Sequence, residues 1–476
     1  MTPAREDRAG RSPYARCMSD VLERLRAELP AEALVTDADR MQSYRNDRAM
    51  FCPAGEPLAV VLARETAHVQ TAVRIAAATG TPVVPQGARS GLSGAANAID
   101  GCIVISLEKM DRVLEIDPVN RYVVTQPGVF NAVLSRAVAE HGLFYPPDPS
   151  SWEFCSIGGN LATNSGGLCC VKYGVTTDYV LGLEVVLASG DVLRTGRRTV
   201  KGVAGYDLTK LMVGSEGTLG IITEATLALR PQAQRPRTMA ALFGSTVAAG
   251  TAITEIVRSG VPLSLLEIMD RTTVRAVNSY LRMDLPADAA AMVIAQSDSG
   301  GEAAAAEIAR VARTCRDQGA IECLEADDPA EGELLLTARR SALPALETLG
   351  TTMIDDVCVP RSRLAEFLSE VERIAERTGV TVAVVGHAGD GNMHPNVVFD
   401  QTDADQSRRA MEAFDQVMAA GLELGGTITG EHGVGVLKMS WLETELGPVA
   451  VEVLRAIKRA LDPQGILNPG KVVTLG

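Results

Sequence analysis

The sequence lacks the features that would mark a secreted, membrane-spanning or nucleic-acid-binding protein. No apolar run approaches the roughly 20 residues that a spanning helix needs, and charged side chains occupy the first 19 residues, where a signal peptide would be apolar. The chain carries 45 lysines and arginines against 59 aspartates and glutamates. This acidic balance disfavours nucleic acid or an anionic membrane as the main partner. We expect a cytoplasmic protein, at most peripherally associated with membranes, with a poorly ordered first dozen residues.

Cysteine motifs and the common nicotinamide motif are also missing. The nine cysteines are scattered apart from the pair Cys169-Cys170, which argues against a disulfide framework. No C-x₂-C-x₂-C run is present, so we expect no iron–sulfur cluster in this chain. No G-x-G-x-x-G segment opens a helix, so the usual NAD fingerprint is absent.

Histidine is scarce, with five in 476 residues, and two of the five lie close together. Residues 386–396 contain both, between two runs rich in valine, and the segment 389–392 has the composition of a hairpin turn. A four-residue loop there would pair His387 with His394 and place Asn396 on the same face. Paired side chains have Cβ atoms about 4.5–5.5 Å apart, so both imidazoles could hold one ion.

A second stretch, residues 430–435, adds a carboxylate and a third imidazole, Glu431 and His432. Two histidines and one carboxylate with open positions suit a divalent transition metal that also binds a substrate. The alternative is a pair of hydrogen-bonded histidines that stabilises a tight turn.

Three glycine-rich blocks lie upstream, at residues 85–96, 146–174 and 202–222. The first follows a β-α-β pattern, with strands predicted at 58–62 and 82–85 around a helix at 66–78. Small residues leave backbone N–H groups free to bind an anion such as a pyrophosphate. Three such blocks suit a large flat ligand that is contacted mainly by backbone.

These blocks resemble the PCMH-type flavin-binding domain that vanillyl-alcohol oxidase and p-cresol methylhydroxylase relatives share. Residues 386–396, 430–438 and 461–471 resemble the C-terminal half of the FAD-linked oxidases. That group includes glycolate oxidase flavoprotein subunits, D-lactate dehydrogenases and D-2-hydroxyglutarate dehydrogenases. The resemblance runs from about residue 40 to the end of the chain.

The resemblance implies an α+β fold with a two-subdomain PCMH/VAO-type FAD-binding domain and an α+β cap. We expect an N-terminal segment at 1–53, the FAD-binding domain at 54–232, a substrate-binding cap at 233–430 and a C-terminal segment at 431–476 that returns to the FAD domain. Strands and helices alternate through the cap, which predicts a mixed, mainly antiparallel sheet.

The resemblance also implies which residues contact FAD. The glycine-rich loop contains no histidine or tyrosine that could bond the flavin, and only His68 and His141 lie elsewhere in the predicted domain, so we expect non-covalent FAD. The implied contacts are Pro85, Gly87, Ala88, Arg89, Ser90, Gly91, Ser93, Gly94, Pro147, Asp148, Ser151, Gly158, Gly159, Asn160, Ala162, Thr163, Asn164, Gly166, Gly167, Tyr173, Gly174, Glu216, Gly217, Gly220, Ile221, Ile222 and Asn468.

For the substrate end, the resemblance implies three metal ligands, His387, His394 and Glu431, which would bind Zn²⁺ or Mn²⁺. Asn396 resembles a residue that contacts the substrate. His432 resembles the general base, and an imidazole can take a hydroxyl proton near neutral pH. The implied reaction is oxidation of a D-2-hydroxy acid to a 2-oxo acid, with hydride transfer to flavin N5.

Arg339 matches the arginine that pairs with the substrate carboxylate, and Arg340 is the less favoured alternative. Relatives specific for 2-hydroxyglutarate carry Thr and Lys where this chain has Leu343 and Ile354, which favours a small substrate, glycolate or D-lactate. The alternatives are D-2-hydroxyglutarate or another larger 2-hydroxy acid, or a non-redox FAD enzyme of the ether-lipid synthase type.

This chain has no second redox centre that its sequence reveals, so the electrons must pass to a separate acceptor. Glycolate oxidase relatives imply iron–sulfur and second flavoprotein subunits. An electron-transfer flavoprotein, a cytochrome or a quinone are the other options. The oligomeric state, a homodimer among the options, is left open.

Overall fold

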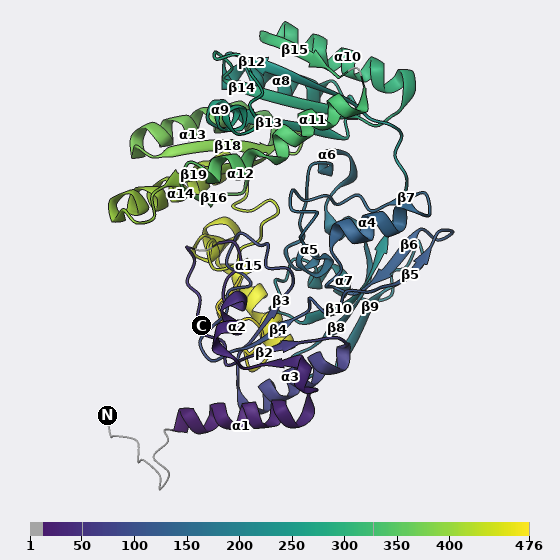
Figure 1. The fold of residues 1–476 in the computed structure, drawn as a ribbon, viewed down its shortest axis with the longest axis vertical. Coiled ribbons are helices and arrows are strands. Elements are labelled where there is room, and N and C mark those ends of the chain that lie inside the picture. Colours follow the sequence, from purple (N-terminus) through teal and green to yellow (C-terminus); the bar gives the residue numbers. More distant parts are fainter. Residues whose placement is uncertain (1–12, 50, 327, 476) are drawn as a thin grey trace.

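A computed structural model of the protein describes residues 13–49, 51–326 and 328–475. The first dozen residues, which we expected to be poorly ordered, lie outside this description. The first part of the fold is a four-stranded sheet of order β1-β2-β4-β3, in which β2, β4 and β3 are parallel and β1 is antiparallel (Figure 1). Its elements are α1 (Pro13–Glu28), β1 (Leu34–Val35), α2 (Ala38–Met41), β2 (Ala59–Leu62), α3 (Thr66–Thr79), β3 (Val83–Gln86) and β4 (Ile103–Ser106).

The β-α-β unit predicted from the sequence is confirmed. Helix α3 ends at Gly80, whose φ of 65° is a left-handed conformation that favours glycine. Helices α1 and α3 bury their apolar residues, such as Leu25 and Val73, with the residues of β2 and β4 in one core.

A second, five-stranded antiparallel sheet has the order β5-β6-β10-β8-β9. Its core joins the strands to α4 and α5 through residues such as Leu134, Leu161 and Leu227. The sequence predicted β5 and β6 but singled out neither β8 nor β9. The elements of this part are β5 (Val113–Asp117), β6 (Tyr122–Thr125), α4 (Asn131–Ala139), β7 (Leu143–Phe144), α5 (Ile157–Thr163), α6 (Cys170–Tyr173), β8 (Val180–Val186), β9 (Val192–Gly196), α7 (Leu208–Met212), β10 (Ile221–Ala228) and β11 (Arg230–Pro231).

Residues 237–399 build an eight-stranded sheet of order β15-β12-β14-β13-β18-β19-β16, with β17 also paired to β19. All of its pairings are antiparallel, which confirms the predicted mainly antiparallel sheet. The strands are β12 (Arg237–Phe243), β13 (Leu265–Asp270), β14 (Ala291–Ser297), β15 (Ala320–Glu325), β16 (Thr351–Ile354), β17 (Val357–Cys358), β18 (Thr381–His387) and β19 (Asn392–Phe399).

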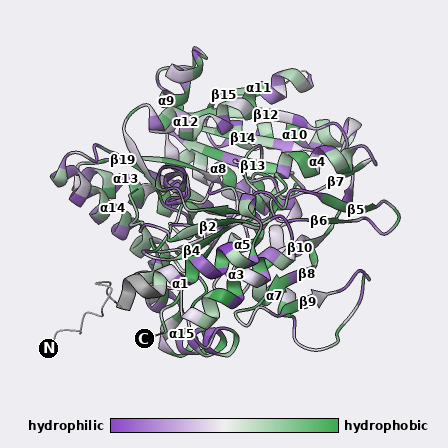
Figure 2. Ribbon diagram, turned by 60° about the horizontal axis from the view of Figure 1, so that its bottom comes forward, coloured by the Kyte–Doolittle hydropathy of each residue, from purple (hydrophilic) through white to green (hydrophobic). Residues whose placement is uncertain are grey.

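Helices cover both faces of the large sheet. One face packs against α8 (Thr246–Arg258), α10 (Gly301–Asp317), α13 (Leu364–Thr378) and α14 (Ala404–Glu423). The other face packs against α9 (Arg271–Leu281), α11 (Pro329–Arg340) and α12 (Ala342–Glu347). Hydrophobic residues gather in the strands, whereas α13 and α14 carry many hydrophilic residues on the outside of the molecule (Figure 2). Among the described helices, none combines the length and the apolar character needed to cross a membrane.

The C-terminal segment lies against the first sheet. Helix α15 (Leu442–Leu461) precedes a parallel bridge between Leu467 and Val83, and Asn468 N donates to Val83 O at 2.7 Å. The residues that follow α15 thus lie beside β3, which is distant from them in the sequence. These contacts agree with a C-terminal segment that returns to the FAD domain, while the domain boundaries after residues 53, 232 and 430 stay predictions.

The hairpin of β18 and β19 has a different register from the predicted one. His394 pairs with Val385, and His387 pairs with Asn392, because the loop comprises residues 388–391 rather than 389–392. The N–H groups of residues 390 and 391 both donate to His387 O, which closes the turn one residue earlier. Both histidines remain on one face, since residues two apart on a strand point the same way.

Candidate active site

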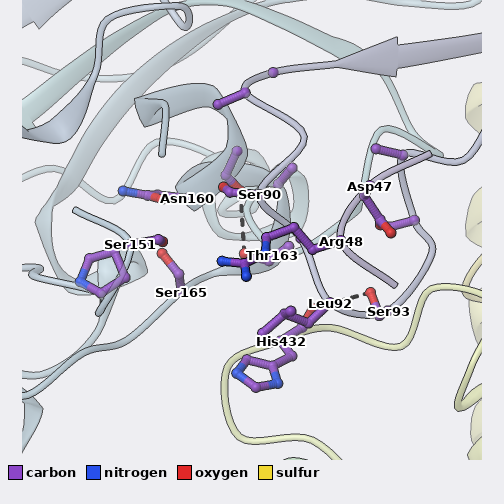
Figure 3. A pocket seen from close by; sticks show the side chains of 18 of the residues that line it. Asp47, Arg48, Ser90, Leu92, Ser93, Ser151, Asn160, Thr163, Ser165 and His432 are labelled. Atoms are coloured by element: carbon purple, nitrogen blue, oxygen red, sulfur yellow. Dashed lines mark hydrogen bonds between the residues drawn. The ribbon is translucent and has the colours of Figure 1, made fainter. Parts of the chain in front are cut away.

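A pocket lies between the two smaller sheets and the large sheet. Its walls come from the loop that follows β3, from residues 149–165, from residues 215–222, and from the inner face of the large sheet. Figure 3 shows Ser90, Thr163, Ser165 and Arg48 around the pocket, with His432 entering from the C-terminal segment. The exposed residues 202–207 of the third glycine-rich block are not among the residues that line it.

Most of the predicted FAD contacts line this pocket. Those that do are Pro85, Gly87, Ala88, Arg89, Ser90, Gly91, Ser93, Ser151, Gly158, Gly159, Asn160, Ala162, Thr163, Glu216, Gly217, Gly220, Ile221 and Ile222. Those placed outside its walls are Gly94, Pro147, Asp148, Asn164, Gly166, Gly167, Tyr173, Gly174 and Asn468. Their individual roles toward the cofactor stay predictions.

Close backbone approach explains glycine in the pocket loops. A Cβ atom on Gly87 would lie 2.4 Å from Ser156 Oγ, and one on Gly158 would lie 2.6 Å from Pro127 Cβ. Ser156 Oγ accepts from Ala88 N and caps α5, so it joins the two loops. Asn160 Nδ2 is buried without a hydrogen-bond partner among the described residues. This wall of backbone and unpaired donors fits a polar, anionic cofactor.

Several predicted contacts outside the walls have structural partners instead. Asp148 accepts from Cys169 N at 3.0 Å, and the hydroxyl of Tyr173 donates to Asp298. Gly166 lies against the carboxylate of Glu431, a predicted metal ligand, since a Cβ there would be 2.6 Å from Glu431 Oε2. Burial raises the pKa of the Cys169 thiol, in line with a packing rather than a reactive residue.

Glu216 and Asn468 join the C-terminal segment to the pocket. Glu216, whose φ is 50°, accepts from Val434 N at 2.7 Å and Gly435 N at 2.9 Å. Asn468 Nδ2 donates to the carbonyl of Glu216 at 2.7 Å. Burial raises the pKa of Glu216 to about 7, against the lowering effect of the two N–H donors.

The three predicted metal ligands converge. His387 Nε2 lies 3.2 Å and His394 Nε2 lies 3.4 Å from Glu431 Oε1, and the two imidazole centroids are 5.1 Å apart. All three side chains are nearly buried. Burial alone would raise the pKa of Glu431, but the two histidines outweigh it and hold that pKa well below the usual range. Glu431 Oε2 has no hydrogen-bond partner among the described residues.

A further carboxylate lies near the Nδ1 atom of each of the two histidines. His387 Nδ1 lies 2.8 Å from Glu267 Oε1, and His394 Nδ1 lies 3.6 Å from Asp356 Oδ1. Asp356 Oδ2 also accepts from the backbone N–H groups of Glu431 and His432, at 2.9 and 2.8 Å. Asp356 therefore orders the loop that carries Glu431.

His432 lies beside the pocket, stacked on a predicted metal ligand. Its ring is nearly parallel to that of His394, with a centroid distance of 4.9 Å and an angle of 13°. Burial lowers the pKa of His432 to about 4, although Asp356 acts in the opposite direction. A neutral imidazole can accept a proton, which is the state that a general base needs.

Arg339 is buried and partly engaged. Its Nε donates to Glu267 Oε2 at 2.6 Å, while its Nη2 is buried with no partner among the described residues. Arg340 is one-third exposed and pairs with Glu333. Both arginines line the pocket, but only Arg339 presents an unpaired buried donor there.

The remaining predicted substrate contacts also face the pocket. Asn396 lines it, and its Nδ2 donates to Ala383 O and His394 O. Leu343 and Ile354 also line the pocket, and Ile354 pairs with Asn396 across β16 and β19. His387, in contrast, is not among the lining residues and sits behind His394 and Glu431.

Comparison with known proteins identifies the family. Residues 57–196 match the model of an FAD binding domain, and residues 232–472 match that of the FAD linked oxidases, C-terminal domain. The chain is 41% identical to "Glycolate oxidase subunit GlcD" of Bacillus subtilis (strain 168), over 87% of this chain and 89% of that protein. The chain belongs to the FAD-linked oxidases.

Other relatives and solved structures agree with this assignment. This FAD-linked oxidase is 35% identical to "Glycolate oxidase subunit GlcD" of Escherichia coli (strain K12), over 95% of this chain and 91% of the relative. It is 34% identical to "D-lactate dehydrogenase" of Anaerostipes hadrus, over 96% and 98%. Its fold matches p-cresol methylhydroxylase with a TM-score of 0.80, at 19% identity and 98% coverage of both chains. The predicted PCMH/VAO-type fold is thereby confirmed, and the protein is an FAD-binding oxidoreductase.

Sequence reasoning missed three buried charged residues of this FAD-linked oxidase. Glu267 lies in the strand sequence Leu265–Asp270, where a carboxylate between apolar neighbours was a usable signal. Asp356 was assigned no role from the sequence. Lys438 is 1% exposed, with its Nζ 3.7 Å from carboxylate oxygens of both Asp355 and Asp356.

Proposed function

We propose that this FAD-linked oxidase oxidises a small D-2-hydroxy acid, glycolate or D-lactate, to the corresponding 2-oxo acid. One observation carries the proposal. An unpaired arginine donor, a neutral imidazole and a His-His-carboxylate cluster meet at one end of the pocket whose other walls are the flavin-type loops. A hydroxy acid needs these groups together: a cation for its carboxylate and a base for its hydroxyl.

The residues divide the reaction among them. Arg339 binds the substrate carboxylate through its free Nη2 edge, a geometry that suits a guanidinium. His432 accepts the proton of the 2-hydroxyl group as C2 is oxidised. Asn396 and His394 line the same pocket. FAD, held non-covalently by the glycine-rich loops, supplies the acceptor for the hydride from C2.

A divalent metal, Zn²⁺ or Mn²⁺, is part of the proposal. His387, His394 and Glu431 would hold it, and it would supply a Lewis acid that lowers the pKa of the hydroxyl group. Their candidate ligand atoms lie within 4.8 Å of one another. The oxygen Glu431 Oε2 lacks a partner within the described residues, which is the kind of buried group that an ion satisfies.

A second set of possible ligands, Asp356, His394 and His432, is less suitable. Lys438 places its ammonium 3.7 Å from Asp356 Oδ2, and a fixed positive charge opposes a bound cation. Asp356 is better placed to orient His394 from behind, as carboxylates commonly do for metal-bound imidazoles.

The substrate preference rests on the apolar lining. Leu343 and Ile354 offer no partner for a second carboxylate, and a buried unpaired charge is costly. This favours glycolate or D-lactate over D-2-hydroxyglutarate. We further propose that a separate protein accepts the electrons: iron–sulfur and second flavoprotein subunits, an electron-transfer flavoprotein or a cytochrome. The cytoplasmic location stays a prediction.

The test is anaerobic bleaching of the flavin. We expect glycolate or D-lactate to bleach it quickly, and L-lactate and D-2-hydroxyglutarate to do so slowly or not at all. Prior chelation should abolish bleaching, and Zn²⁺ or Mn²⁺ should restore it. No bleaching by any of the four acids would refute the proposed function. Bleaching that is indifferent to chelation would refute the metal alone. Acid denaturation should release all the yellow colour into the supernatant, as non-covalent FAD requires.

A further inference from the structure

Glu267 connects the two halves of the proposed substrate site. Both of its carboxylate oxygens are engaged: Oε2 by Arg339 Nε at 2.6 Å, and Oε1 by His387 Nδ1 at 2.8 Å. The side chain is 1% exposed. Glu267 comes from β13, His387 from the neighbouring strand β18 and Arg339 from α11, so one carboxylate joins three elements.

Stability alone does not explain a charge at this place. On its own face of the sheet, the Glu267 side chain lies between Leu265 and Met269, which belong to the apolar core under α9, α11 and α12. An apolar residue of similar size would serve folding at least as well, because a buried ion pair rarely stabilises more than well-packed apolar side chains. The residues it contacts, in contrast, each point a second nitrogen toward the active site.

We propose that Glu267 is a positioning residue that couples the arginine that binds the substrate carboxylate to the metal centre. One oxygen accepts from Nδ1–H of His387 and so leaves Nε2 free to bind an ion beside Glu431. The other holds the Nε edge of Arg339, so that the Nη2 edge faces the pocket. This inference rests on the proposed function and extends it.

The coupling has a consequence that separates it from ordinary packing. Within the described residues, no hydrogen bond or ion pair joins Arg339 to any of the three proposed metal ligands. Its link to them is Glu267. A change at Arg339 should nevertheless alter metal affinity, because Glu267 would shift when its second partner is lost. Coupling between two groups is reciprocal. Removal of the metal should therefore also weaken the binding of a substrate carboxylate to Arg339.

The first experiment compares Glu267→Gln with Asp270→Asn in the flavin-loaded protein. Asp270 lies on the same strand and caps α9 through Thr273 N, and asparagine is an equally good cap. Glutamine can accept from only one of the two donors. After chelation, Mn²⁺ is titrated and the free ion is measured by its electron paramagnetic resonance signal. We expect roughly 10- to 100-fold weaker Mn²⁺ binding in Glu267→Gln, the usual scale for loss of such a partner. Asp270→Asn should bind Mn²⁺ like the wild type, and both variants should retain FAD.

The second experiment is a double-mutant cycle on the same Mn²⁺ affinity. Arg339→Lys should weaken Mn²⁺ binding severalfold when Glu267 is present. It should have no further effect in the Glu267→Gln background. Equal effects of Arg339→Lys in both backgrounds would overturn the coupling. Should Glu267→Gln fail to fold, Glu267→Asp retains the charge but is too short to reach both partners, and it should weaken Mn²⁺ binding as well.

The outcomes distinguish this inference from the proposed function. If the wild type binds neither Mn²⁺ nor Zn²⁺, the metal assignment is wrong, and the proposed coupling is wrong as well. If the wild type binds Mn²⁺ and Glu267→Gln binds it as tightly, the coupling alone is wrong. In that case the proposed function would be unaffected, and glycolate or D-lactate should still bleach the flavin.

Discussion

The two ends of the pocket are built by different means. At the flavin end, the walls are loops in which glycine permits close approach of the backbone, as Gly87 and Gly158 show. At the other end, buried charged side chains from β13, β18, β19, α11 and the loop at 429–433 meet in one cluster. Glu267, Asp356 and Glu431 each engage more than one partner there.

This difference predicts how each end responds to substitution. Backbone donors persist when a side chain changes, so single substitutions in the flavin loops should act mainly where they add bulk. A buried charge, in contrast, leaves its partners unpaired when it is removed, and such a loss is costly. Substitutions at the charged end should therefore reduce turnover by larger factors than substitutions in the flavin loops, while FAD stays bound.

The largest effect is expected for His432→Ala. Loss of the proposed general base should reduce turnover by roughly 10²–10⁴-fold. Flavin content should be unchanged, because the side chain belongs to the charged end. Stopped-flow bleaching with D-lactate or glycolate measures the rate, and absorbance per protein measures the flavin. Normal turnover in the variant would end the assignment of His432 as the base.

Glu216 lies where the two ends meet and provides a pH test. Burial raises its pKa to about 7, so the folded state holds its proton more tightly than the unfolded state. The contribution of Glu216 to stability is then largest below the unfolded pKa of about 4.5 and declines as pH rises to about 7, by about 3 kcal/mol in all. Glu216→Gln cannot titrate, so the Tm of the wild type relative to this variant should be lower at pH 8 than at pH 5. A constant Tm difference would mean that the two N–H donors keep Glu216 ionised throughout.

The sequence signals of the flavin end are more local than those of the charged end, for a physical reason. Backbone recognition requires small residues in contiguous loops, and such loops are visible as glycine-rich blocks. The β-α-β unit was equally visible, because Gly80 and the apolar pattern are local signals. The exposed residues 202–207 show the limit of this reasoning, since a glycine-rich loop need not face the ligand.

The charged end was only partly predictable because its members come from distant elements. His387, His394 and Glu431 carried recognisable motifs, but Glu267 is 120 residues from the histidine it contacts. The predicted hairpin register was wrong. Both histidines still share a face, because His387 pairs with Asn392, and Asn392 and His394 are two residues apart on one strand. Periodicity therefore predicted which side chains meet, whereas the pairing partners depended on the turn.

A smaller effect is expected for Arg339→Lys. Lysine has a single nitrogen, which cannot occupy both the Nε position at Glu267 and the Nη2 position at the pocket, as the guanidinium does. Loss of a charge-assisted hydrogen bond of about 1.5–3 kcal/mol corresponds to roughly 10- to 100-fold in kcat/KM, mainly through KM. Steady-state dye reduction with glycolate and D-lactate measures it. Arg340→Lys is the matched control, since Arg340 pairs with Glu333 at the surface. A larger loss of kcat/KM in Arg340→Lys than in Arg339→Lys would mean that Arg340, not Arg339, binds the substrate carboxylate.

The smallest effect is expected at the apolar lining. Ile354→Lys introduces a cation where Ile354 faces the pocket, and it gives a second carboxylate a partner. The ratio of kcat/KM for D-2-hydroxyglutarate to that for D-lactate should rise about tenfold, which corresponds to about 1.4 kcal/mol. Ile354→Met, of similar volume without charge, should leave the ratio unchanged. If both substitutions change the ratio equally, pocket volume rather than charge selects the substrate. The lack of a carboxylate partner at Leu343 and Ile354 would then not explain the preference for small hydroxy acids.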